Sequence, residues 1–295
     1  GNTSLESSMV GMAQKFKNSL PLLEGIGQFG SLRSPSAGAP RYISAKLHPN
    51  FRLLYQDFEL LDNKIEEGER IEPEHFLPIV PTVILNGTSG IAVGFATNIL
   101  NRNPKDVVDA CIAEVHGKRM KTLAPWIEEF KGTFTRDLEN PKTWKISGSY
   151  QVINTNTVKI TAIPPNYTYE RYEEILNLLQ EKGIITSYDD NSSETIEYVL
   201  KFRRSILKDL VSKDKLERAL RLNTQETENL TTIDENGKLK IFNKAEEIVK
   251  HFVSIRLGWY QTRKDYLIDK TEKQLSLVKN FNFVLKMTAE LHVKL

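Results

Sequence analysis

Tyr42 is the residue whose neighbours best suit covalent chemistry on a phosphate. It follows Arg41 in the run Ala39-Pro40-Arg41-Tyr42-Ile43. Tyrosine is a poor nucleophile at neutral pH because a phenol stays protonated there. A neighbouring cation favours the phenolate and can bind the phosphate under attack. The pair therefore fits phosphoryl transfer to tyrosine, although an arginine beside a tyrosine is common and most tyrosines only pack in a core.

The charges along the chain form blocks that the net charge of +2 conceals. Residues 25–56 contain no Asp or Glu but carry several arginines and lysines. The acidic segment 57–74 follows, and residues 75–105 again contain no acid. Such blocks fit surfaces that meet a polyanion such as DNA. The alternative is chance combined with burial, because the second acid-free block is largely apolar.

The run Gly25-Ile26-Gly27-Gln28-Phe29-Gly30 matches the GxGxxG pattern of dinucleotide-binding loops. Such a loop needs a preceding strand, a helix that opens inside it and an acid about 20 residues later. Here the next acid is Asp57, and residues 33–40 are rich in Ser, Pro, Gly and Ala. We therefore reject nucleotide binding and expect the glycines to permit a sharp turn or a close backbone approach.

Residues 86–94 form a second glycine-spaced run, with Ile91 in its middle. One interpretation is a tight turn between buried strands. The other is that Ile91 is a wedge that enters a base step, as apolar side chains do in DNA-bending proteins. The spacing alone favours the tight turn.

The elements that position these residues are predicted from periodicity and turn signals. Thr3-Ser4-Leu5-Glu6 is a capping-box pattern, and apolar residues recur at helical spacing to residue 16, which predicts a helix with one face on the core. The N-terminus of this helix can face a phosphate.

Residues 106–250 indicate a mixed α/β region. We predict helices near 106–115 and over 170–182, strands over 150–163 and 195–202, and a hairpin over 231–241 around an Asn-Gly turn. Gly183 is the expected C-cap of the second helix. Residues 244–295 lack proline and carry an apolar stripe, which predicts one or two long helices of a coiled-coil arm.

Composition indicates a globular protein of about two domains. The single cysteine, Cys111, cannot form an intrachain disulfide or a zinc site, so we expect a reducing compartment and a buried thiol. The apolar segment 76–99 is interrupted by prolines and glycines, so we predict core rather than a membrane segment. The chain begins abruptly at Gly1 and ends inside a helical pattern, and we expect a fragment.

Several of these runs occur in one order, within residues 1–104: residues 1–4, 12–16, 25–31, 39–43 and 81–98. Together they resemble the breakage–reunion region of type IIA DNA topoisomerases. The runs at 27–30 and 39–43 are similar to the eukaryotic enzymes and the T-even phage medium subunit, whereas residues 86–94 are similar to bacterial gyrase A. This mixture favours a phage or viral enzyme, in the nucleoid or the cytoplasm of an infected bacterium. Beyond residue 104 the resemblance is looser.

The resemblance implies roles for individual residues. Tyr42 matches the nucleophile that stays linked to the 5′ end, Arg41 matches the arginine that stabilises the scissile phosphate, and Ile91 matches the isoleucine that intercalates. Further expected DNA-binding residues are Thr3, Ser4, Arg33, Lys46, Arg52, Gln28 and Ser89. Thr3 and Ser7 match positions beside the quinolone pocket of bacterial enzymes, but Ser7 replaces a commonly acidic residue, which puts drug response in doubt.

The resemblance also implies groups from outside this sequence. The family's catalytic histidine precedes the position of Gly1. Mg²⁺ is held by a TOPRIM domain and ATP by an ATPase domain or subunit, and neither is recognisable here. We therefore expect this chain by itself to be unable to cleave DNA. The expected partners are double-stranded DNA, a second copy of the chain and the TOPRIM/ATPase subunit or domain, with no membrane.

The resulting prediction is an α+β fold in three parts. Residues 1–60 form the C-terminal part of a winged-helix domain, 61–243 a tower-like domain with the intercalating loop, and 244–295 the base of a coiled-coil arm. The predicted function is cleavage and religation of a DNA gate during ATP-driven strand passage. The alternative is a non-cleaving DNA-binding or architectural protein with the same fold.

Overall fold

The chain folds into two compact units of mixed α and β structure. The computed structural model describes residues 1–193 and 195–293. One unit comprises Gly1–Leu54 and Val80–Lys250, and the other comprises Tyr55–Ile79 and His251–Leu295. The predicted α+β class is confirmed, and the units cut across the predicted boundaries at 60 and 243. Within the described ranges, no helix is long and apolar enough to span a bilayer.

The first unit opens with a helix and a two-stranded ribbon. Its elements are α1 (Asn2–Ala13), β1 (Leu23–Ile26), the short 3-10 helix η1 (Pro40–Tyr42), β2 (Ser44–Leu47) and α2 (Pro49–Leu54). The predicted capping box is wrong: α1 begins at Asn2, and its N-cap Gly1 has no side chain to accept a hydrogen bond. The predicted core face is also wrong over most of its length, because Leu5, Met9 and Met12 are exposed and Ala13 is buried.

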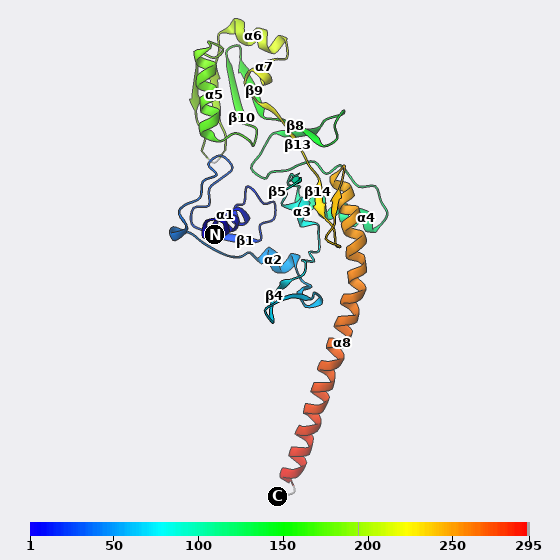
Figure 1. Ribbon diagram of the computed structural model, residues 1–295. Helices are drawn as coiled ribbons and strands as arrows, with labels where there is room; N and C mark the ends of the chain where they lie inside the picture. The colour runs from blue at the N-terminus through cyan, green and yellow to red at the C-terminus, as the bar shows by residue number, and fades with distance from the viewer. Residues whose placement is uncertain (194, 294–295) are drawn as a thin grey trace. The chain divides into compact units, whose positions relative to one another are not determined.

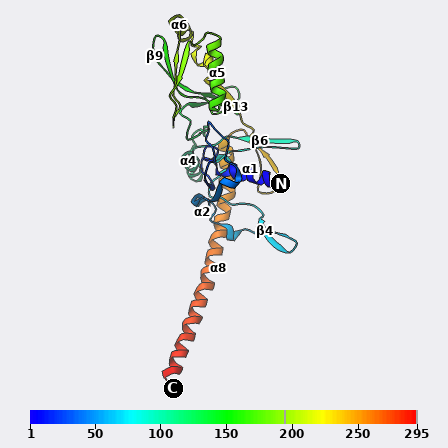
Figure 2. The ribbon, with the colours of Figure 1, turned by 90° about the vertical axis from the view of Figure 1, so that its left-hand side faces the viewer.

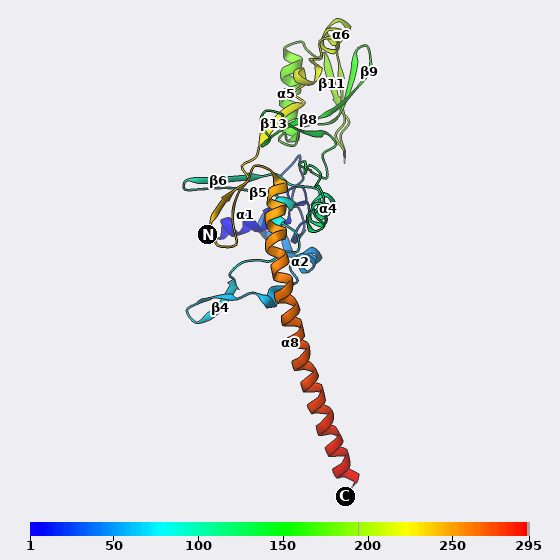
Figure 3. The ribbon, with the colours of Figure 1, turned by 90° about the vertical axis from the view of Figure 1, so that its right-hand side faces the viewer.

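A two-stranded hairpin projects from this unit. Helix α3 (Thr82–Leu85) leads into β5 (Thr88–Ala92) and β6 (Phe95–Ile99). Figures 2 and 3 show the hairpin extending to the same side as the N-terminus of α1. The predicted burial of residues 76–99 is correct for Ile84 and Ile99 but wrong for the hairpin tip, because a two-stranded ribbon without a covering layer leaves both faces in solvent.

Helix α4 (Pro104–Val115) confirms the predicted helix of this region. Asn103 caps it, since the Asn103 side chain accepts from the backbone N–H groups of Lys105 and Asp106. Cys111 on α4 is half-buried, and burial raises the pKa of its thiol to about 11. A thiol with that pKa stays protonated at neutral pH and behaves as a small apolar group.

Two antiparallel sheets follow. The first has the order β13-β8-β7 and the second β11-β12-β10-β9. Their strands are β7 (Thr133–Arg136), β8 (Thr143–Ser147), β9 (Ser149–Asn154), β10 (Thr157–Ala162), β11 (Ser187–Asp190), β12 (Tyr198–Lys201) and β13 (Asn223–Thr227). The prediction of one strand over 150–163 is wrong, because the Asn154 side chain accepts from the N–H of Asn156 and closes a turn between β9 and β10.

The main core lies between the four-stranded sheet and its helices. Helix α5 (Tyr169–Glu181) packs against the sheet (Figure 1), and α6 (Arg204–Ser212) and α7 (Leu216–Ala219) follow β12. The fully buried residues include Val158, Ile160, Tyr172, Leu176 and Leu200. The predicted helix and its C-cap region are confirmed, with Gly183 at a φ of 69°.

The hairpin predicted over residues 231–241 is confirmed. Strands β14 (Thr231–Ile233) and β15 (Leu239–Ile241) pair antiparallel around the predicted Asn-Gly turn. The Asp234 carboxylate accepts from the N–H groups of Asn236 and Lys238. This local bonding explains why the turn is readable from sequence.

The second unit contains a short segment and a long helix. Its elements are η2 (Phe58–Leu60), β3 (Asn63–Glu66), β4 (Glu69–Pro73) and α8 (Ala245–Val293), whose first residues belong to the first unit. The buried Asp57 carboxylate pairs with Arg256 and Arg263 of α8. Helix α8 has 49 residues, which confirms the predicted long helix.

Candidate active site

Tyr42 lies in a single turn whose side chains face solvent. Pro40 begins η1, and the backbone N–H of Tyr42 donates to the carbonyl of Ala39 at 2.9 Å. The Tyr42 side chain is 76% exposed. The guanidinium carbon of Arg41 lies 5.5 Å from the centre of the Tyr42 ring. The nucleophile and the cation predicted to act on one phosphate are therefore adjacent and accessible to a large substrate.

Glycines bring the preceding loop close to this turn. Gly27 has a φ of 106°, and a Cβ there would lie 3.2 Å from the carbonyl oxygen of Tyr42. Gly30 has a φ of 78°, and a Cβ there would lie 2.8 Å from the backbone of Pro35. After β1 the chain forms a loop rather than a helix. The glycines thus serve turns and close approach, as expected, and not a nucleotide.

Gln14 holds this loop against the end of α1. Its side-chain nitrogen donates to the carbonyls of Phe29 at 2.8 Å and Pro35 at 3.0 Å, and the residue is buried. We did not identify Gln14 from sequence. The available signal was a polar residue inside the apolar helical pattern between Ala13 and Phe16.

Arg33 is buried within the first unit, with 7% of its surface exposed. Its guanidinium donates to the carbonyls of Ile163 at 2.7 Å, Pro164 at 2.9 Å and Tyr167 at 2.9 Å. Burial lowers its pKa to about 10, which leaves it protonated at neutral pH. This use of its donors within the fold argues against the predicted contact of Arg33 with DNA, and we do not propose one.

Ile91 lies near the tip of the β5–β6 hairpin, opposite Ala96. Its side chain is 94% exposed, and that of Val93 in the turn is 100% exposed. The tight turn of the first interpretation does form, at Val93 and Gly94, but the strands that it joins are exposed at this tip rather than buried. An apolar side chain held on a ribbon without packing partners has the shape that insertion between stacked bases requires.

A buried network supports the base of the hairpin. The Glu228 carboxylate accepts from the N–H of Leu100 at 2.9 Å, from Arg102 at 2.7 Å and from the Trp144 indole at 2.8 Å. Asn229 pairs with Asn98 of β6 through two backbone hydrogen bonds of 3.0 and 2.9 Å. These partners gave no signal in sequence, because Arg102 and Glu228 lie 126 positions apart.

Two asparagines link the same hairpin base to the segment after α1. Asn86 exchanges hydrogen bonds with the backbone N–H and carbonyl of Leu20, at 2.8 and 2.9 Å. Asn101 donates to the carbonyl of Lys17 at 2.6 Å. The hairpin that carries Ile91 and the segment that leads to Tyr42 are thus bonded to each other within one unit.

The remaining predicted residues are surface groups of the first unit. Thr3, Ser4 and Ser7 are exposed on α1, Gln28 in the loop, Arg52 on α2 and Ser89 on β5. Lys46 on β2 is exposed and lies 3.3 Å from the Glu24 carboxylate. Because an exposed ion pair of this kind is weak, it leaves Lys46 available to another anion.

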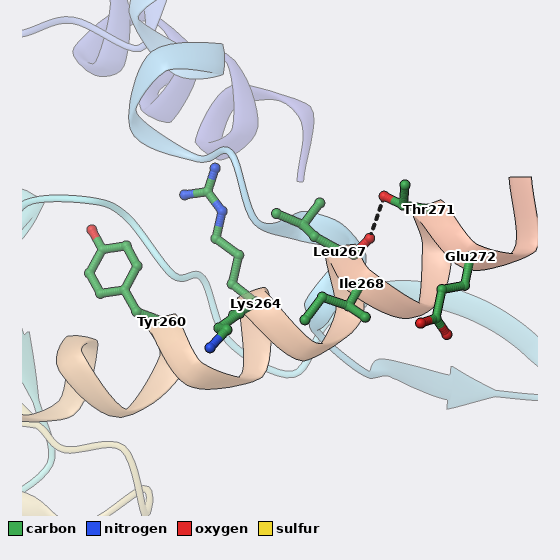
Figure 4. A pocket seen from close by; sticks show the side chains of 7 residues that line it. Tyr260, Lys264, Leu267, Ile268, Thr271 and Glu272 are labelled. Atoms are coloured by element: carbon green, nitrogen blue, oxygen red, sulfur yellow. Dashed lines mark hydrogen bonds between the residues drawn. The ribbon is translucent and has the colours of Figure 1, made fainter. Parts of the chain in front are cut away.

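Figure 4 shows an open groove on α8 that involves no predicted site residue. It is lined by Tyr260, Arg263, Lys264, Leu267, Ile268, Thr271 and Glu272. All of these side chains come from one helix, so the groove lacks the enclosing walls of a small-molecule site.

The residues around Tyr42 do not fit a metal site. Among protein side chains, Mg²⁺ binds chiefly carboxylates. Residues 25–56 contain neither Asp nor Glu. Across residues 1–193 and 195–293, no group of three or more His, Cys, Asp and Glu side chains could hold a metal ion.

The chain matches a known protein family and individual relatives over most of its length. Residues 1–293 match the family of the A subunits of DNA gyrase and topoisomerase IV. The chain is 34% identical over 281 residues to the DNA topoisomerase medium subunit of Enterobacteria phage T4, covering 94% of this chain and 63% of that protein. It is 33% identical over 286 residues to a mitochondrial DNA topoisomerase 2 of Dictyostelium discoideum, covering 93% of this chain and 22% of that protein.

A solved structure shares the fold. The crystal structure of the Plasmodium falciparum topoisomerase II DNA-binding, cleavage and re-ligation domain superimposes with a TM-score of 0.84 at 33% identity. The match covers 93% of this chain and 39% of that chain. The chain thus spans less than two thirds of the length of each of these relatives.

Proposed function

Because the chain belongs to the family of the A subunits of DNA gyrase and topoisomerase IV, we propose that it is the DNA-cleaving part of a type II DNA topoisomerase. The observation that carries this proposal is the exposed pair of Arg41 and Tyr42 on the turn η1, in a run that resembles the family's motif. The proposed activity is reversible double-strand cleavage, coupled in the complete enzyme to ATP-driven passage of a second duplex.

The proposed reaction is a transesterification. The Tyr42 phenolate oxygen attacks a phosphorus of the DNA backbone, an O–P bond to tyrosine forms, and the bond from phosphorus to the 3′ oxygen breaks. The 3′ oxygen takes up a proton, and the 5′ end stays on the protein. The Arg41 guanidinium stabilises the charge on the phosphate under attack. Religation is the reverse attack, and the phosphotyrosyl ester conserves the bond energy.

Ile91 is the proposed wedge in this reaction. Its exposure on a projecting hairpin supports insertion into a base step, which bends the duplex. Further proposed DNA contacts are Thr3, Ser4, Gln28, Lys46, Arg52 and Ser89. Thr3 and Ser7 are the proposed drug-pocket positions.

We propose that the predicted domains are the parts of this enzyme. Residues 1–60 form the end of a winged-helix domain and 61–243 a tower-like domain. The coiled-coil arm begins at 244, and the exposed apolar residues along α8, such as Leu277 and Phe281, support a helical partner there.

The gate is proposed to contain two copies of the chain. The exposed Leu5, Met9 and Met12 on α1 support this, because a monomer gains nothing from leaving an apolar helix face in water. Leu5→Asp should weaken self-association, whereas Val152→Asp on β9 should not. Sedimentation velocity measures the difference, and equal association of both variants would remove α1 from the interface.

Other partners and the source complete the proposal. We propose that Mg²⁺ is bound by a TOPRIM domain and ATP by an ATPase domain or subunit outside residues 1–295. The mixture of sequence motifs and the similarity to the phage T4 protein support a phage or viral source acting in bacterial cytoplasm.

The test is covalent capture of DNA. The full-length protein and its partner subunits are incubated with supercoiled plasmid and Mg²⁺ and then denatured. Protein–DNA adducts should form, should vanish in Tyr42→Phe, and should persist in the control Tyr188→Phe, which removes an exposed hydroxyl on β11. Adducts that persist in Tyr42→Phe would refute the assigned nucleophile. Tight DNA binding without any adduct would favour the architectural alternative.

A further inference from the structure

We propose that Arg33 is a positioning residue that fixes the Tyr42 loop to the connector between β10 and α5. It acts on the rate of cleavage without touching DNA. This inference rests on the proposed role of Tyr42 and adds a residue that couples the cleavage loop to the sheet and helix that follow it.

The side chain of Arg33 contacts the connector, and its backbone contacts the first residue of α5. The guanidinium donates to the carbonyls of Ile163, Pro164 and Tyr167 at 2.7 to 2.9 Å. In return, the backbone N–H of Tyr169 donates to the carbonyl of Arg33 at 3.1 Å. The attachment therefore restrains the position of the loop backbone as well as one side chain.

The acceptors explain why an arginine is needed. The three carbonyls lie on both sides of the turn between β10 and α5, which the N–H of Tyr167 closes on the carbonyl of Pro164, so they do not form the regular row of a strand. A guanidinium presents five N–H donors in a planar fork, whereas an ammonium is a compact point with three. Among the ion pairs of the described residues none includes Arg33, so the carbonyls are its direct partners, and the charge of Glu129 acts on it without a salt bridge.

The same loop has a second attachment near Tyr42. The N–H of Gly38 donates to the carbonyl of Gln28 at 2.9 Å, which closes the loop at its base. Gln14 holds the loop to the end of α1 through Phe29 and Pro35. Residues 39–42 follow directly, so these attachments and that of Arg33 restrain the backbone of η1, which carries Tyr42.

Loss of one attachment should alter the chemical step more than binding. In-line attack on phosphorus depends on placement of the nucleophile, and a displacement of about 1 Å can cost about 100-fold in rate. Duplex affinity depends on phosphate contacts spread over the surface. The buried Arg33 makes no such contact, so its removal should leave the affinity for DNA almost unchanged.

The experiment compares Arg33→Lys and Arg33→Met in the full-length protein with its partner subunits and Mg²⁺. With protein in excess over a short duplex, the single-turnover rate of adduct formation is measured by denaturant quench. The Kd for the duplex is measured by fluorescence anisotropy in the same salt. Arg33→Met should lower the rate by about 100-fold, and Arg33→Lys by less. The Kd should change by less than about threefold and keep its dependence on salt.

Arg171→Lys is the matched control, because Arg171 is an exposed arginine on α5 that pairs with Glu174. It should cleave at the wild-type rate. All rates are taken well below the Tm of each variant, and if Arg33→Met does not fold, Arg33→Lys decides. Wild-type rates in both Arg33 variants would overturn the inference. So would a parallel loss of affinity with a shallower salt dependence, which indicates a phosphate contact.

Tyr42→Phe in the same assay separates this inference from the proposed function. If Tyr42→Phe still forms adducts, Tyr42 is not the nucleophile and the inference fails with it. If Tyr42→Phe forms none and the Arg33 variants cleave normally, only the role of Arg33 is refuted.

Discussion

At the scale of single residues, the chemistry depends on what each side chain is free to do. Arg41 and Tyr42 face solvent on one turn, so both can reach the same phosphate. Arg33 lies in the same acid-free stretch, but its donors are used by carbonyls. The two arginines therefore differ in what they are free to do: Arg41 is open to a substrate, whereas the donors of Arg33 are occupied within the fold.

Arg41→Gln should slow adduct formation by about 100-fold, because a preorganised cation no longer stabilises the charged phosphate. Arg41→Lys should retain part of the rate, since lysine keeps the charge but lacks the planar fork. Single-turnover quench measurements with and without each substitution check this. A wild-type rate of cleavage by Arg41→Gln would show that Arg41 does not stabilise the charge on the phosphate.

At the scale of elements, the β5–β6 hairpin combines a free tip with a fixed base. Its tip is exposed on both strands. Its base is bonded to residues 228–229 on one side and to Leu20 and Lys17 on the other. These bonds at the base would hold the hairpin in place when the proposed wedge enters a base step.

Ile91→Ala should reduce bending of bound duplex and the yield of cleavage while leaving stability within about 0.5 kcal/mol, as is usual for exposed positions. Fluorescence resonance energy transfer between dyes on the duplex ends measures the bend. Ile153→Ala, which shortens an exposed isoleucine on β9, is the control. An unchanged bend in Ile91→Ala would exclude the wedge.

Glu228→Gln should destabilise the first unit by about 3 kcal/mol, because removal of one partner leaves the Arg102 charge buried and uncompensated. Glu174→Gln breaks an exposed pair and should cost less than about 0.5 kcal/mol. Urea unfolding followed by circular dichroism compares the two. Pairing Glu228→Leu with Arg102→Met should recover much of the loss, and equal midpoints for all variants would contradict a structural role for the pair.

At the scale of the whole molecule, two units meet different demands. The first unit holds Tyr42, Ile91 and their supports through hydrogen bonds between distant segments. In the second unit, residues 57–59 are attached to α8 by charged groups, including Glu59 with Tyr266 at 2.7 Å and Lys270 at 2.5 Å. The attachment of residues 57–59 to α8 therefore depends on the ionisation of these side chains.

The attachment of η2 to α8 should weaken in acid. Hydrogen bonds from Lys270 and Tyr266 lower the pKa of Glu59. A carboxyl with a lowered folded pKa stabilises fully above its unfolded pKa, near 4.3, and loses that stabilisation as pH falls through the folded pKa. The same hydrogen bond raises the pKa of Lys270. The stabilisation that the Lys270 ammonium contributes is therefore lost only at strongly alkaline pH.

Hydrogen exchange of residues 58–60, corrected for intrinsic pH dependence, measures this effect. Protection in the wild type should be full above the unfolded pKa of glutamate, near 4.3, and should fall as the pH drops below it. It should be low and less dependent on pH in Glu59→Gln. Identical pH profiles for the two proteins would show that Glu59 does not control the contact.

Local elements and the family could be read from sequence because their determinants lie close together along the chain. The Asn-Gly hairpin, α5 and α8 are specified by bonds between near neighbours and by apolar spacing. The ordered runs from residue 1 to residue 98 indicated the family that the comparison confirms. The roles of Tyr42, Arg41 and Ile91 remain proposals from that membership and from their exposure.

Only the tertiary structure decided which side chains are covered. It left the apolar face of α1 exposed, buried Arg33 and paired Arg102 with Glu228. Spacing along a helix or loop specifies which residues share a face, but not whether another segment covers that face. That depends on contacts between residues more than a hundred positions apart, for which one sequence carries no local signal.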